Sequence, residues 1–295
     1  MTVAFEPARL VALPPRETTA AHGESQAILY ALGVGVTNAG ALEPEALNHA
    51  VGAPLSVLPT MAVVMAWPGF WMMEPQYGID WKRVLHAEES LELHAPLPAR
   101  AEVTGRIHIE RIVDKGAAKG SLLYSRRELF DVATGQHLAT ERRTTFLRGN
   151  GGAGDAQAPS ADASGYRPLE EVPQREPDET VTLPTREDQA LLYRLSGDMN
   201  PLHADPAVAK SVGFARPILH GLCTYGVVGR ALLAGVCGGD PARFRRMDCR
   251  FTLPVYPGET LATDIWHEDD GRAAFRTRAV ERDAVVLSHG RFEHH

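Results

Sequence analysis

The residues best suited to chemistry lie in one run, Tyr193–His203, which reads Tyr-Arg-Leu-Ser-Gly-Asp-Met-Asn-Pro-Leu-His. Within it, Asp198 supplies a carboxylate, Asn200 an amide and His203 an imidazole. Pro201 lacks an N–H and disfavours helix at the preceding residue, so we expect a shaped turn on which the three side chains converge. Such a set can hold a water molecule and exchange protons near neutral pH, which is typical of an enzyme. The same residue types also build ordinary turns, in which Asp198 would only cap the segment.

A second segment, Arg216–Gly221, offers a place for negative charge at the start of a predicted helix. Pro217 suits a first helical turn, where unpaired N–H groups favour an anion. Gly221 has no Cβ, so an oxygen that gains negative charge during a reaction could approach its N–H closely. The plainer interpretation is that Gly221 allows tight packing and that His220 forms a hydrogen bond near the helix start.

Two predicted helices must position these residues. The first has Thr185 as its N-cap and ends at Gly197, a common helix-terminating residue. The second covers Ile218–Val236, where apolar residues recur at steps of three and four and the other faces are also apolar or small. A helix of this kind is buried. Ser25–Leu32 is the counterpart of the first helix in the N-terminal half.

Strand-like segments separated by turn signals follow the helices in both halves of the chain. The predicted strands are Ala101–Val113, Lys119–Asp131 and Gln136–Leu147 in the first half, and Arg243–Thr252, Glu259–His267, Arg272–Val280 and Val285–Phe292 in the second. An antiparallel sheet around a buried helix is expected in the second half. In the first half only Leu58–Trp67 could be the central helix, and prolines interrupt it. We therefore expect an α+β fold with a short or missing N-terminal helix and a cavity in its place.

The Gly/Ala/Ser-rich segment Gly149–Ser160 predicts a flexible linker between the halves. The predicted organisation is an N-terminal domain at 1–148, a linker at 149–178 and a C-terminal domain at 179–295. The net charge of −7 argues against nucleic acid as a partner. Neither a secretory signal nor a stretch of about 18 apolar residues is found, so no membrane span is predicted. Three cysteines, Cys223, Cys237 and Cys249, fit plain packing in a reducing, cytoplasmic compartment, and no spacing indicates a metal site.

Tyr193–Ala209 and Arg216–Gly221 together resemble the hydratase motif of the MaoC-like, 2-enoyl-CoA hydratase 2 family. Shorter similarities to its two-domain members extend over the whole chain, at Tyr30–Gly35, Val113–Gly116, Phe146–Gly149 and Phe251–Gly258. The resemblance implies a double hot-dog fold, in which each unit is an antiparallel sheet around a central helix. It further implies a hydro-lyase of fatty acyl-CoA metabolism and β-oxidation, which reversibly hydrates trans-2-enoyl-CoA to (3R)-3-hydroxyacyl-CoA. An acyl-CoA thioester is then the partner, no cofactor is needed, and a homodimer is expected.

Carried over by position, the resemblance makes Asp198 and His203 the catalytic pair, with Asn200 helping to hold the water and Gly221 donating to the thioester oxygen. Matching substrate contacts fall at His86, Ala87, Lys115, Met199, Pro201, Leu202 and Phe251. Ala87 stands where the family has glycine, which could crowd the ligand. Candidates for the CoA phosphates are Lys115, Arg243, Arg245, Arg246 and Arg250.

Three alternatives remain open from the sequence. A hot-dog thioesterase would use the same scaffold to release CoA. A related dehydratase for a branched, dicarboxylic or sterol-derived acyl-CoA would keep the mechanism and change the pocket. The segment Trp67–Met73, unusually rich in aromatic residues and sulfur, is either simple core or part of such an altered acyl pocket. A non-enzymatic acyl-CoA-binding subunit is less favoured, because a dead site would not need Asp198, Asn200 and His203 together.

Overall fold

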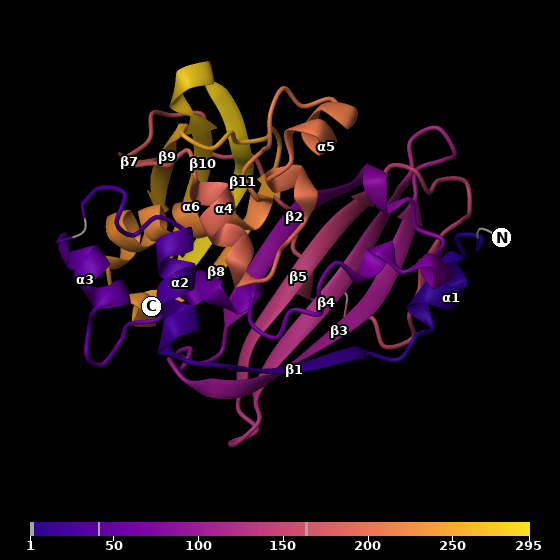
Figure 1. The fold of residues 1–295 in the computed structure, drawn as a ribbon, viewed down its shortest axis with the longest axis horizontal. Helices are drawn as coiled ribbons and strands as arrows, with labels where there is room; N and C mark the ends of the chain where they lie inside the picture. The colour runs from indigo at the N-terminus through magenta and orange to yellow at the C-terminus, as the bar shows by residue number, and fades with distance from the viewer. Residues whose placement is uncertain (1–2, 41, 163–164) are drawn as a thin grey trace.

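One antiparallel sheet runs through the computed structural model, which describes residues 3–40, 42–162 and 165–295. Its strand order is β1-β3-β4-β5-β2-β8-β11-β10-β9-β7, and a short β6 pairs with β3 (Figure 1). The strands are β1 (Arg16–His22), β2 (Val84–Leu93), β3 (Ala101–Asp114), β4 (Ser121–Asp131), β5 (His137–Leu147), β6 (Ala156–Gln157), β7 (Glu179–Pro184), β8 (Phe244–Phe251), β9 (Thr260–Glu268), β10 (Arg272–Ala279) and β11 (Ala284–His294). All seven predicted strands are confirmed, each to within two residues. The predicted α+β class is confirmed as well.

Strands β1, β2 and β7 were not predicted. β1 lacks an apolar alternation, and in β7 the alternation consists of only two apolar residues, Val181 and Leu183. β1 and β7 are the two edges of the sheet, where polar side chains face solvent. β2 is central, but it carries Glu88, Glu89 and Glu92 among its apolar residues. A strand with this composition does not stand out by hydrophobic pattern alone.

The two halves join into one sheet where β2 pairs with β8. Opposite charges meet across this junction, since Glu88 lies opposite Arg250 and Glu92 opposite Arg246. The Arg250 Nη2 to Glu88 Oε1 distance is 2.8 Å. Directly opposed charges of unlike sign favour one register over its neighbours. The two halves therefore pair within one chain.

Helices cover the inner face of the second half. The α-helices are α1 (Pro7–Val11), α2 (Glu24–Gly33), α3 (Pro44–Ala50), α4 (Gln189–Tyr193), α5 (Pro206–Ser211) and α6 (Gly221–Cys237), and the 3-10 turns are η1 (Pro59–Val63), η2 (Trp71–Met73), η3 (Pro75–Tyr77), η4 (Trp81–Arg83), η6 (Arg194–Ser196), η7 (Pro201–His203), η8 (Pro241–Arg243) and η9 (Val280–Arg282). α6 is the predicted buried helix. Its one charged residue, Arg230, is 1% exposed and donates to Glu45 of α3 at 2.6 Å and to the Val34 carbonyl at 2.9 Å.

The two helices predicted to position the candidate site, α4 and α6, both begin later in the chain than predicted. α6 starts at Gly221 rather than Ile218, because the Leu219 N–H donates to the Val255 carbonyl at 2.7 Å and holds the chain extended. Pro217 therefore precedes the helix and is not in its first turn. α4 starts at Gln189 and not after Thr185, whose hydroxyl donates to the Glu259 carbonyl at 2.6 Å.

In the first half, the place of the central helix is taken by the single 3-10 turn η1, which packs against α6. The predicted short N-terminal helix is thus confirmed. The described part of the chain has no helix long and apolar enough to cross a membrane. Cys223, Cys237 and Cys249 are buried free thiols, as expected for packing residues.

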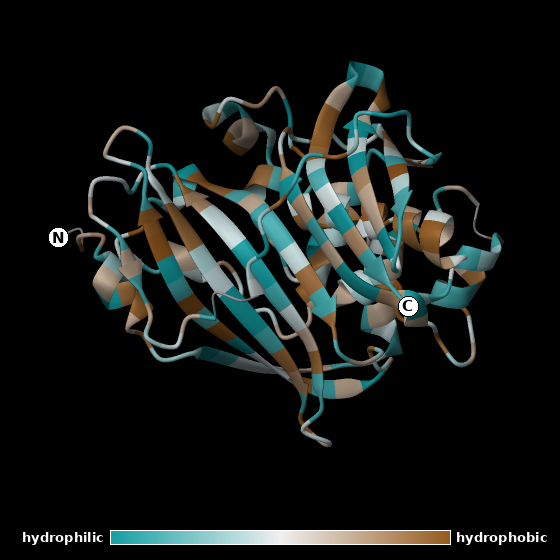
Figure 2. Cartoon of the chain, turned by 180° about the vertical axis from the view of Figure 1, so that it is seen from behind, coloured by the Kyte–Doolittle hydropathy of each residue, from teal (hydrophilic) through white to brown (hydrophobic). Residues whose placement is uncertain are grey.

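The segment after β5 is not the coreless linker that its composition predicts. Ala158 is 6% exposed and belongs to a buried apolar cluster beneath α1. Farther on, the Tyr166 hydroxyl donates to the Ser125 carbonyl of β4, and Val172 packs against Trp266 of β9 and Ala274 of β10. This segment therefore crosses the outer face of the sheet from one half to the other, on the side shown in Figure 2. Small residues let it lie close to the strands.

Candidate active site

The run after α4 forms the predicted shaped turn. Gly197 ends η6 with φ of +119°, a conformation that glycine adopts most readily. The backbone N–H of Asn200 donates to Asp198 Oδ1 at 3.1 Å, and Asn200 Oδ1 accepts the Leu202 N–H at 3.0 Å. Because the amide oxygen of Asn200 is committed to the turn, only its Nδ2 group is left to bind a ligand. Asn200 is thus a donor toward the cavity.

His203 is held in one tautomer. Its side chain lies in a buried position, and its Nδ1–H donates to the Ile218 carbonyl at 2.9 Å. The other ring nitrogen, Nε2, then carries the lone pair. Burial lowers the pKa of His203, although the nearby Asp198 carboxylate acts in the opposite direction. His203 is therefore neutral at physiological pH and able to accept a proton.

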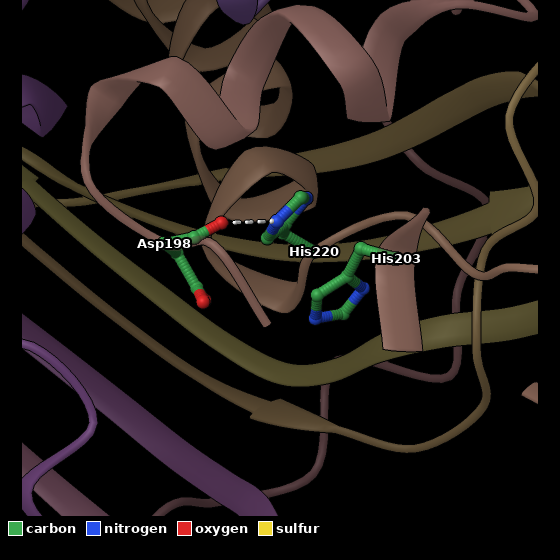
Figure 3. A group of neighbouring side chains, drawn as sticks. All are labelled: Asp198, His203 and His220. Carbon is green, nitrogen blue, oxygen red and sulfur yellow. Dashed lines mark hydrogen bonds between the residues drawn. The ribbon is translucent and has the colours of Figure 1, made fainter. Parts of the chain in front are cut away.

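His220 joins the other two members of this site. Its ring stacks on His203 with a centroid distance of 3.7 Å and an interplanar angle of 27°. Its Nε2–H donates to the backbone carbonyl of Asp198 at 3.1 Å, the bond drawn in Figure 3. Burial, reinforced by the neighbouring His203, lowers the pKa of His220 to about 2. The sequence analysis expected only a hydrogen bond near the helix start, whereas this neutral ring also supports both predicted catalytic residues.

Among the described residues, ligand atoms of Asp198, His203 and His220 lie within 4.8 Å of one another, a spacing that could hold a metal ion. The two rings stack face to face with 27° between their planes, whereas a metal ion lies close to the plane of each imidazole that binds it. One nitrogen of each ring is also bound to a carbonyl. The geometry therefore fits a hydrogen-bonded site better than a metal site.

Gly221 is the first residue of α6, and no side chain of the described chain caps this helix. Its N–H groups are thus available to an oxygen in the cavity. A Cβ at this position would lie 3.3 Å from Phe251 Cε1, so glycine lets the ring pack against the helix start. On its other side Phe251 contacts the His86 ring at a centroid distance of 4.5 Å. Phe251 therefore connects the start of α6 at Gly221 with His86 in the first half of the chain.

A cavity of about 380 Å³ brings both halves together. Of the predicted site residues, it is lined by Asp198, Asn200, Leu202, His203, Gly221, Phe251 and His86. Trp67, Phe70, Trp71 and Met72 line it from the first half. Trp71 and Met72 are also part of a buried cluster, so this segment contributes both to the core and to the cavity wall.

Four predicted substrate contacts lie outside this cavity in the described structure. Ala87 sits at a β-bulge between His86 and Glu88, and Met199 is 56% exposed. Pro201 is exposed on the outer side of the turn, and Lys115 is exposed in the β3–β4 turn. These residues do not face the site because neighbouring positions in a turn or a bulge point in different directions.

The arginines proposed for the CoA phosphates are engaged elsewhere. Arg246 is 3% exposed and its Nε lies 2.9 Å from Asp248, so that assignment is wrong. Arg250 is paired with Glu88. Arg245 and Arg243 lie six and eight residues before Phe251, roughly 20 Å and roughly 26 Å away at about 3.3 Å per residue.

Arg143 and Thr145 on β5 also line the cavity and were not among the predicted site residues. Arg143 donates to Glu89 Oε2 at 3.1 Å and to Glu141 Oε1 at 2.6 Å. Burial raises the pKa of both glutamates, against the lowering effect of nearby arginines. The signal was present, because Glu141, Arg143 and Thr145 alternate and so share one face of a confidently predicted strand.

Residues 168–289 match the family described as MaoC like domain, and residues 21–149 match the MFE-2 hydratase 2 N-terminal domain. The chain is 43% identical over 273 residues to 3-hydroxyacyl-thioester dehydratase Y of Mycobacterium tuberculosis, covering 90% of this chain and 91% of that protein. It is 36% identical over 281 residues to the peroxisomal enoyl-CoA hydratase 2 of Arabidopsis thaliana, covering 92% and 90%.

Solved structures are similar along the whole chain. A MaoC-like dehydratase from Phytophthora capsici superposes with a TM-score of 0.84 at 33% identity, covering 97% of both chains. A Mycobacterium tuberculosis protein described as a double hotdog fold gives a TM-score of 0.56 at 18% identity, covering 98% of both chains. The predicted double hot-dog fold is therefore confirmed.

Proposed function

The chain belongs to the MaoC-like dehydratase family, and on this premise we propose that it reversibly adds water to trans-2-enoyl-CoA to form (3R)-3-hydroxyacyl-CoA. The observation that carries the proposal is the meeting of Asp198, Asn200, His203 and Gly221 at one cavity. This set combines a place for water with a donor for an enolate-like oxygen. The activity is that of an (R)-specific hydro-lyase acting on acyl-CoA.

In the proposed reaction, a water molecule is held by the Asp198 carboxylate, the Asn200 Nδ2 group and His203 Nε2. Conjugation with the thioester makes C3 of the substrate electrophilic. The water oxygen bonds to C3 while the Asp198/His203 pair takes a proton from the water and delivers a proton to C2. General acid–base help of this kind contributes about 10²–10⁴-fold in rate.

During attack, negative charge builds on the thioester oxygen. The N–H at Gly221, at the uncapped start of α6, is the donor that we propose for it. A donor in such a position contributes on the order of 10²–10³-fold. Since the thioester itself activates the alkene, we propose that neither a metal nor an organic cofactor takes part.

The test compares Asp198→Asn and His203→Gln with the wild type on crotonyl-CoA, following the loss of enoyl absorbance. Each variant should lose about 10²–10⁴-fold in kcat while keeping its melting temperature. Asp205→Asn is a matched control, because Asp205 caps α5 through Ala207 and asparagine caps helices equally well. Near-normal hydration by either site variant would overturn the assignment. A thiol reagent run in parallel distinguishes hydration from a thioesterase, which would release CoA.

We propose two further properties that rest on the same function. The first is assembly of the chain into a homodimer, as hot-dog proteins commonly pair. The second is a cytoplasmic location. Gel filtration with light scattering tests the first, and a fluorescent fusion in the source cell tests the second.

A further inference from the structure

One end of the cavity is buried and polar. Thr145 of β5 lines the cavity and is 2% exposed, yet its Oγ1 has no hydrogen-bond partner among the residues that the structure describes. Leaving a buried hydroxyl unpaired costs about 1–3 kcal/mol. A side chain in this state indicates that something else completes its hydrogen bond.

Arg143 stands two residues away on the same face of β5. Its Nε and Nη2 groups are bound to Glu89 and Glu141, and its guanidinium lies over the Trp67 ring at 4.6 Å. Within the described chain, its remaining nitrogen, Nη1, has no hydrogen-bond partner. Thr145 and Arg143 thus present a free hydroxyl and free N–H groups to the same space.

This polar wall lies where the acyl chain would extend. The contacts run from Gly221 through Phe251 to His86, and His86 is the cross-strand partner of Thr145. The cavity opens to solvent at Leu253, which lines it and is 51% exposed, and at Leu85, which is 43% exposed. The charged CoA portion stays in solvent; we place it at the Leu253 opening, so that the tail runs past Phe251 toward Thr145.

Resting on the hydratase activity proposed above, we propose that the preferred substrate carries a hydroxyl or carbonyl oxygen on its acyl chain, bound by Thr145 and Arg143. An unsubstituted alkyl tail would leave these buried groups unpaired, which strongly disfavours such a ligand. The oxygen is neutral and not a carboxylate. Glu89 and Glu141 already surround Arg143, so a further negative charge would meet two acids.

The experiment measures kcat/KM for 2-enoyl-CoA substrates of one chain length, unsubstituted or with a hydroxyl moved carbon by carbon along the tail. An ω-carboxyl analogue is included. The wild type should prefer one hydroxylated substrate about tenfold or more over the alkyl substrate. Thr145→Val, which keeps the shape, should remove that preference, and Thr145→Ser should retain it.

Thr144→Val is the matched control, because Thr144 bonds Glu88 and does not line the cavity. It should leave the preference unchanged. Equal or better use of the alkyl substrate by the wild type would overturn the inference, as would a preference that survives Thr145→Val. Preference for the ω-carboxyl analogue would also overturn it. Failure to hydrate any substrate would instead refute the proposed function.

Discussion

Replacing His220 with phenylalanine tests whether this ring positions the site without touching substrate. His220 is 1% exposed, does not line the cavity, and contacts both proposed catalytic residues. Phenylalanine keeps a ring against His203 but removes the N–H that donates to the Asp198 carbonyl at 3.1 Å. An orphaned buried carbonyl costs about 1–3 kcal/mol.

If this cost raises the activation free energy, kcat falls by about 5- to 150-fold, because each increase of about 1.4 kcal/mol slows the reaction about tenfold. KM should change little, because the substrate does not reach His220. His220→Gln can still donate to the Asp198 carbonyl and should lose less. The assay is hydration of crotonyl-CoA, with circular dichroism and thermal melts to show that each variant folds.

His94→Phe is the control for a general effect of this substitution. His94 also lies against a second histidine ring, that of His137, with centroids 4.2 Å apart and 42° between the planes, but it is exposed and lies outside the cavity. Its replacement should leave kcat unchanged. A folded His220→Phe variant with wild-type kcat would refute the positioning argument, and equal losses in His220→Phe and His94→Phe would show that the effect is not specific.

Three other outcomes follow from the same geometry. Asn200→Asp keeps the oxygen that accepts the Leu202 N–H, so the melting temperature of this variant should stay the same while its kcat falls. Asn200→Ala removes that oxygen and should also lose about 0.5–2 kcal/mol of stability, measured by urea unfolding. Gly221→Ala places a methyl group 3.3 Å from Phe251 and should reduce kcat/KM about tenfold or more with little change in stability; unchanged kinetics would argue against a donor there. The pKa of His220 is about 2 in the folded protein and 6.5 in the unfolded chain. As the pH falls below 6.5, His220 therefore gains a proton only in the unfolded state. The stability advantage of the wild type over His220→Gln should then shrink by about 1.4 kcal/mol per pH unit, and a pH-independent difference between their urea curves would contradict this.

The sequence by itself determined the local structure and the chemical types at the site. The turn signals between seven of the strands, the apolar periodicity of Ile218–Val236 and the proline after Asn200 are local signals. They predicted these elements, although α6 begins three residues later and β1, β2 and β7 were missed. The Asp198, Asn200 and His203 turn was predictable because its geometry depends on residues adjacent in the chain.

Only the tertiary structure decided which distant groups share the cavity. His86, Arg143 and Thr145 come from strands that reach Gly221 only through the β2–β8 junction, and no local pattern encodes that junction. Arg246 looked like a solvent-exposed base in the sequence, but a chain segment far from it crosses the sheet and buries it against Asp248. Likewise the contact between His220 and His203 exists because folding stacks the two rings. Burial and long-range pairing change the role of a side chain without changing its type, and for this reason they could not be predicted from the sequence.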